Sequence, residues 1–210
     1  MTPTAMFKLA VGAIHVISLA VDVADKFVDV LKKAGVIKNS SNSDELGAKV
    51  LRGQELGITP EKVETLKDYE EYARQIDAIE LPQNQSYSLK EKHDAANEFI
   101  TGAMNMKYGK KSGVNNFLAE VDGHSNFYSP ERIDSYMNCA EQKNLNMENI
   151  GRYFDSKLDS MQDIRQTESV LIAAEKFIGV NEQDAKKNFA TERSQRAEPR
   201  EIATSEMNKI

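Results

Sequence analysis

Apolar residues recur at steps of three and four along most of this chain, and no stretch alternates apolar and polar residues as a half-buried strand does. This periodicity predicts α-helices, because residues three and four apart share one face of a helix. Signals for helix starts stand at Thr59, Ser88, Ser129 and Ser160. Glycines placed to end helices are Gly35, Gly109, Gly123 and Gly179. We therefore expect an all-α fold, an irregular multi-helix bundle of about seven or eight helices.

The longest helix is expected over residues 5–34, with a length of about 45 Å at 1.5 Å per residue. Its polar residues form one stripe that runs from Lys8 through His15 and Asp22 to Lys33. The apolar arc opposite is wider than a surface helix needs, which indicates burial in a bundle, in an oligomer or at a membrane face. The residues expected to make these contacts are Val16, Ala20, Val23, Phe27 and Leu31.

The same segment permits two other interpretations. Residues 9–21 contain no Asp, Glu, Lys or Arg, but this run is shorter than the roughly 20 apolar residues of a transmembrane helix. A helix that lies in the membrane interface is one alternative. A cleaved signal peptide is the other, with Lys8 before the apolar run and Ser18, Leu19 and Ala20 as a small-x-small cleavage site. The polar stripe continues through that site, which favours a single helix.

Three regions are expected along the chain. Residues 1–37 hold the long amphipathic helix, and residues 38–180 form the helical bundle domain. Large apolar groups near the remaining stretch are few: Val180, Phe189, Ile202 and Ile210. Such a segment buries too little surface to offset the entropy lost on ordering. We expect residues 181–210 to be a disordered polar tail.

The charge balance argues against a nucleic-acid-binding function. The chain has 33 acidic and 27 basic residues and a formal net charge of −6, whereas phosphate contacts require a basic surface. Residues 49–68 have the apolar spacing of a helix-turn-helix, but the second helix would present Glu61, Glu64 and Asp68 to DNA. We therefore expect a protein partner or a second copy of the chain, with a membrane as the alternative.

Motifs that carry catalytic or metal-binding chemistry are weak. His93 and Asp94 form a dipeptide found in some metal sites, but the only upstream histidine, His15, lies in the first predicted helix. An acid, a base and a hydroxyl stand close together at residues 122–125, although catalytic triads are assembled in space and not in sequence. The single cysteine, Cys139, lies among apolar residues at helical spacing and is expected in the core. No residue is assigned to catalysis, to a cofactor or to a metal.

These observations favour a non-enzymatic helical interaction protein, such as an adaptor, an assembly subunit or a bacterial effector-like module. One alternative is a membrane-associated protein anchored by residues 5–34. The other is an enzyme with a scattered acidic site, in which Glu120 or Asp122 lies in a cleft. A cytoplasmic or membrane-associated location is favoured, and the signal-peptide interpretation would instead imply secretion.

Overall fold

The computed structural model describes residues 8–9, 12–13, 15–84 and 86–197. Over these residues the fold is all-α, and the helices pack around one continuous apolar core. The helices are α1 (Val21–Lys33), α2 (Ser43–Glu55), α3 (Leu66–Asp77), α4 (Leu89–Tyr108), α5 (Val114–Gly123), α6 (Pro130–Gln142), α7 (Glu148–Phe154), α8 (Met161–Phe177) and α9 (Glu182–Ala197). Short 3₁₀ turns are η1 (Pro60–Lys62), η2 (Lys110–Ser112) and η3 (Ser125–Phe127). A small antiparallel hairpin pairs β1 (Lys8–Leu9) with β2 (Gly12–Ala13).

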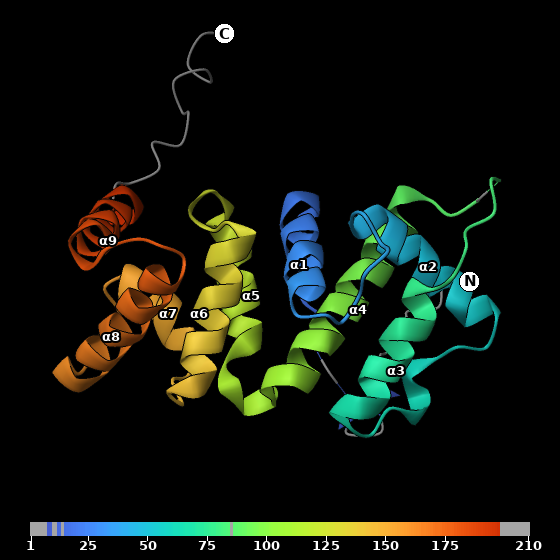
Figure 1. The fold of residues 1–210 in the computed structure, drawn as a ribbon, viewed down its shortest axis with the longest axis horizontal. Helices are drawn as coiled ribbons and strands as arrows, with labels where there is room; N and C mark the ends of the chain where they lie inside the picture. The colour runs from blue at the N-terminus through green and yellow to red at the C-terminus, as the bar shows by residue number, and fades with distance from the viewer. Residues whose placement is uncertain (1–7, 10–11, 14, 85, 198–210) are drawn as a thin grey trace, which may run out of the picture.

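Helix α1 lies in the middle of the molecule (Figure 1). The helices α2, α3 and α4 are on one side of it, and α5 to α9 are on the other. It contacts α2 and α4 in one direction and α6 in the other. Its apolar face is therefore covered from both sides, and the buried residues are Val23, Ala24, Phe27, Val28, Val30 and Leu31.

Three of the four predicted helix starts are confirmed. The hydroxyl groups of Ser88, Ser129 and Ser160 each accept a hydrogen bond from the backbone N–H three residues later, as helix caps do. The start predicted at Thr59 is wrong, because only the short turn η1 follows it. The helix α3 begins later, where Thr65 and Asp68 form a capping box.

The prediction of one helix over residues 5–34 is also wrong. Helix α1 begins at Val21, and residues 15–20 form neither helix, turn nor bend. The reason is tertiary, because backbone groups of these six residues bond to side chains of α4 and α5 instead of to each other. Residues 5–7, 10, 11 and 14 of the predicted helix lie outside the described residues. In the described part of the chain, no helix has the length and apolar character needed to cross a bilayer.

The prediction of a disordered tail from residue 181 is wrong for its first half. Helix α9 is ordered against the bundle, with Ala185, Phe189 and Glu192 buried. The ring of Phe189 packs edge-on against Tyr153 and Phe154. Few apolar residues suffice here, because Ala185 and Phe189 are buried completely and the charged residues Glu192 and Arg196 are paired. The rest of the predicted tail, residues 198–210, lies outside the described residues.

Candidate functional site

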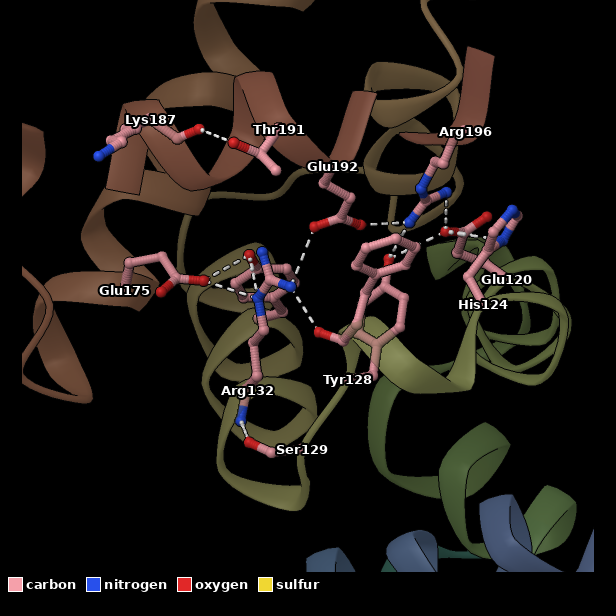
Figure 2. A network of polar contacts seen from close by, with 12 residues as sticks. Glu120, His124, Tyr128, Ser129, Arg132, Glu175, Lys187, Thr191, Glu192 and Arg196 are labelled. Carbon is pink, nitrogen blue, oxygen red and sulfur yellow. Dashed lines mark hydrogen bonds and ion pairs between the residues drawn. The ribbon is translucent and has the colours of Figure 1, made fainter. Parts of the chain in front are cut away.

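The most unusual chemistry in the structure is a group of ionised side chains buried where α5, α6, α8 and α9 meet (Figure 2). Two arginines alternate with three glutamates, and their side chains are only 3–13% exposed. We call these residues the charge cluster: Glu120, Arg132, Glu175, Glu192 and Arg196. A buried charge is costly unless it is paired and hydrogen-bonded, so the position of each partner matters.

Arg132 joins α6 to α8 and α9. Its Nε donates to Glu175 Oε1 and to the Tyr136 hydroxyl, both at 2.7 Å. Its Nη1 lies 3.0 Å from Glu192 Oε2 and also donates to the Phe127 carbonyl oxygen. Because the Ser129 cap fixes the first turn of α6, this guanidinium is held where it can reach both neighbouring helices (Figure 2).

Arg196 makes the corresponding connection from α9 to α5. Its Nη1 donates to Glu120 Oε1, and its Nη2 donates to Glu192 Oε1. The Tyr128 hydroxyl donates to the same Glu120 oxygen at 2.9 Å. Figure 2 shows Glu192 between the two arginines, so a single carboxylate bridges both of them.

Burial and charge shift the pKa values within the cluster in different directions. Burial raises the pKa of Glu192, although Arg132 and Arg196 lower it. Burial lowers the pKa of both arginines, but the neighbouring tyrosine and carboxylate groups outweigh this effect and raise it overall. Burial also raises the pKa of Tyr128 and Tyr136 well above the ordinary value, so both phenols are neutral hydrogen-bond donors.

These contacts make the charge cluster a fastening for α9. Its carboxylates accept hydrogen bonds from groups on neighbouring elements, and each guanidinium also lies over an aromatic ring, Arg132 over Tyr136 at 5.0 Å and Arg196 over Phe154 at 4.9 Å. The described residues contain no group of three or more side chains that could hold a metal ion. By connecting α9 to its neighbours, the charge cluster fixes the position of α9 beside α8 at the protein surface.

On the surface, α8 and α9 together with the end of α6 form a hollow of about 470 Å³. We call it the α8–α9 hollow. Its charged residues are Lys143, Arg165, Glu168, Lys176, Glu182 and Lys186. Ile172 and Ala173 contribute half-buried apolar groups. Helical spacing places Phe177, which is 78% exposed, one turn beyond Ala173 on the same face.

Cations exceed carboxylates in the α8–α9 hollow. Glu182 pairs with Lys176 at 2.8 Å and with Lys186 at 2.9 Å. These two lysines lower the pKa of Glu182 to about 2. Lys143 and Arg165 form no ion pair with any residue that the structure describes. Two exposed cations of this hollow therefore have no described carboxylate within ion-pair distance, although Glu168 lines the same hollow.

The interaction residues predicted from the sequence lie elsewhere. Val23, Phe27 and Leu31 are buried in the core of the same chain, so they offer no surface to a partner. Val16 is half-buried and Ala20 is exposed, and both belong to the non-helical segment before α1.

The side chains considered for catalysis do not converge. Glu120 belongs to the charge cluster, and Asp122 accepts a hydrogen bond from the Ala20 N–H. His124 lies beside Glu120, with 3.6 Å between Nδ1 and Oε1. Asp94 pairs with Lys90 and not with a second metal ligand.

Cys139 is half-buried, and burial raises the pKa of its thiol. The cluster residues of α6, α8 and α9 were not predicted from the sequence. Their only local signal is the four-residue spacing of Glu192 and Arg196, which is common on exposed helices as well.

Comparison of this chain with protein-family models, with curated proteins and with solved structures finds no match. Its function therefore has to be argued from its own residues.

Proposed function

We propose that this protein is a non-enzymatic helical interaction protein, and that its α8–α9 hollow binds an acidic segment of a partner protein. The observation that carries this proposal is the charge of the hollow. The chain as a whole has a net charge of −6, yet four cations and two carboxylates line this part of its surface. An acidic partner would be repelled by most of the molecule and attracted here.

The hollow also supports a particular partner chemistry. Lys143 and Arg165 form no ion pair among the described residues, so carboxylates of a partner could pair with both of them. Ile172 and Ala173 provide an apolar base, and Phe177 extends it along α8. A helix with acidic residues on one side and leucine or a similar residue on the other would match both features.

The expected binding is weak to moderate and depends on salt. Exposed ion pairs contribute about 0.2–1 kcal/mol each, and salt screens them within about 10 Å at 0.1 M ionic strength. Most of the remaining affinity would come from the apolar contacts.

The test uses a fluorescein-labelled amphipathic peptide built from glutamate and leucine, titrated with the full-length protein and followed by fluorescence anisotropy. The double variant Lys143→Glu/Arg165→Glu is expected to weaken binding by about tenfold or more, because two attractions become repulsions. The matched control is Lys67→Glu/Lys187→Glu, which changes the net charge by the same amount at exposed positions outside the hollow.

Equal weakening by the two double variants would show only a general effect of charge and would contradict the proposal. Absence of binding to the unmodified protein at low salt would contradict it as well. Light scattering on the same samples identifies a second copy of the chain as the partner if a dimer is found and Lys143→Glu/Arg165→Glu dissociates it. Circular dichroism establishes that the variants retain their helices.

A further inference from the structure

The six residues before α1 are held against the bundle in an unusual way. Residues 15–20, which we call the strap, form no helix, turn or bend, and Ala20 has extended backbone angles. The strap is bonded to two of four polar residues on α4, which recur every four residues and so share one face of the helix. These residues are His93, Asn97, Thr101 and Asn105. The last three are no more than 4% exposed.

The polar residues bind the backbone of the strap. The Ile17 N–H donates to Thr101 Oγ1 at 3.3 Å, and Asn97 Nδ2 donates to the Leu19 carbonyl oxygen at 3.4 Å. From α5, the Asp122 carboxylate accepts the Ala20 N–H at 2.6 Å. None of these three bonds involves a strap side chain, so any extended segment could form them, provided that proline does not replace a donor.

Leu19 is the most deeply buried side chain of the strap, and Ile17 is partly buried against the same apolar core. Leu19 is 1% exposed and belongs to the apolar core, whereas His15, Ser18 and Ala20 are exposed. Backbone hydrogen bonds combined with one buried aliphatic anchor are the features by which proteins recognise extended peptides. We call Asn97, Thr101, Asp122 and the core position of Leu19 the strap site.

The strap leaves part of the hydrogen-bonding capacity of this site unused. Asn97 is 1% exposed, and its Oδ1 has no hydrogen-bond partner among the described residues. The buried His93 Nδ1, one helical turn away, also lacks a described partner. A buried acceptor without a donor is costly, so a peptide that brought an N–H group to Asn97 Oδ1 would gain a bond that the strap does not make.

We propose that the strap site is a binding site for an extended segment of a partner protein that carries leucine or a similar aliphatic residue at the Leu19 position. The strap is then a competitor built into the chain. Because partner and strap exclude each other, the apparent affinity for the partner equals the intrinsic affinity multiplied by the fraction of molecules in which the strap is released. Weakening the strap therefore strengthens binding of the partner.

The experiment uses the full-length protein and a fluorescein-labelled peptide with the sequence of residues 13–22, followed by fluorescence anisotropy. The variant Leu19→Asp removes the anchor of the strap and leaves the strap site intact, because a carboxylate is too costly to bury there. We expect this variant to bind the peptide at least about tenfold more tightly than the unmodified protein. A peptide carrying the same Leu→Asp change is expected to bind neither protein.

A second variant tests the proposal independently, in case Leu19→Asp does not fold. Ala20 has φ −65°, which is the value that proline requires, so Ala20→Pro removes only the N–H that donates to Asp122. This bond is charge-assisted, and we expect its loss to strengthen peptide binding by roughly tenfold. Hydrogen exchange should show faster exchange of the Ile17 amide in the same variant.

Two results would overturn the proposal. One is that Ala20→Pro, folded by circular dichroism, binds the peptide no more tightly than the unmodified protein does. The other is that adding Thr101→Val to Ala20→Pro leaves the binding unchanged, since Thr101 accepts a strap hydrogen bond. The strap site and the α8–α9 hollow share no residue, so these results are independent of the test of the hollow.

Discussion

Replacing Arg132 by methionine is expected to destabilise the protein severely and to loosen α9 first. Methionine retains much of the apolar stem of arginine and removes the guanidinium. The change therefore deletes the cation that lies 2.7 Å from Glu175 Oε1 and 3.0 Å from Glu192 Oε2. Both carboxylates are almost fully buried, with side chains 4% and 3% exposed. Glu192 would keep Arg196 as a partner, but Glu175 would keep only the hydroxyl of Tyr136.

The size of the effect follows from the burial. Removing one partner of a buried ion pair costs about 3–5 kcal/mol, because the remaining charge is left without compensation. A typical domain has a free energy of unfolding of about 5–15 kcal/mol, so the loss would be a large part of the total. We expect about 3–5 kcal/mol at pH 8, measured by urea denaturation followed by far-UV circular dichroism.

The loss should also depend on pH. Burial already raises the pKa of Glu192, and Arg132 is one of the two cations that lower it, so the pKa of Glu192 is expected to rise further without Arg132. When the pKa of a carboxyl group is higher in the folded than in the unfolded state, the free energy of unfolding of the protein decreases as pH rises through the interval between the two values. The deficit of Arg132→Met should therefore be smaller at pH 5 than at pH 8.

Two further variants make this test decisive. Arg165→Met changes the same residue type at an exposed position without a described ion pair, and it should leave the urea midpoint almost unchanged. Arg132→Lys retains the charge but not the planar group that donates to several acceptors, so an intermediate loss is expected. A deficit for Arg132→Met below about 1 kcal/mol at pH 8 would show that the charge cluster is not needed to hold α9.

Two other predictions concern the opposite side of the molecule. Burial and the nearby Asp94 raise the pKa of Glu98 to about 7, so the native state loses stability as pH rises from about 4 to about 7. Glu98→Gln should therefore raise the free energy of unfolding by roughly 1–3 kcal/mol at pH 8 and leave it unchanged at pH 4, as urea titrations at both values would show. A Cβ at Gly47 would lie 1.8 Å from the Lys92 carbonyl oxygen, so Gly47→Ala should separate α2 from α4 and cost about 1–3 kcal/mol or more. Gly123→Ala, where a Cβ meets no atom within 4 Å, should be neutral or stabilising. Thermal melts of both variants test this, and equal melting temperatures for the two would contradict the packing argument.

Most helices could be predicted from the sequence, because helix formation depends on residues that are close together in the chain. The caps at Ser88, Ser129 and Ser160 require only a hydroxyl group and a backbone N–H three residues later. The apolar face of α1 from Val23 to Leu31 follows from the helical period alone, and the structure buries it as the spacing predicts. Neither signal depends on which other helix lies opposite.

The start of α1, the order of α9 and the charge cluster were decided by contacts between residues far apart in the chain. Residues 15–20 share a helical pattern with α1, but Thr101 and Asp122 give their backbone better partners. The α9 sequence has few apolar residues, and it is ordered because Phe189 packs against α7 and the arginine–glutamate pairs connect it to α5 and α6. Burial of a charge is favourable only when its partner is in place, and the sequence alone does not show which side chains the fold brings together.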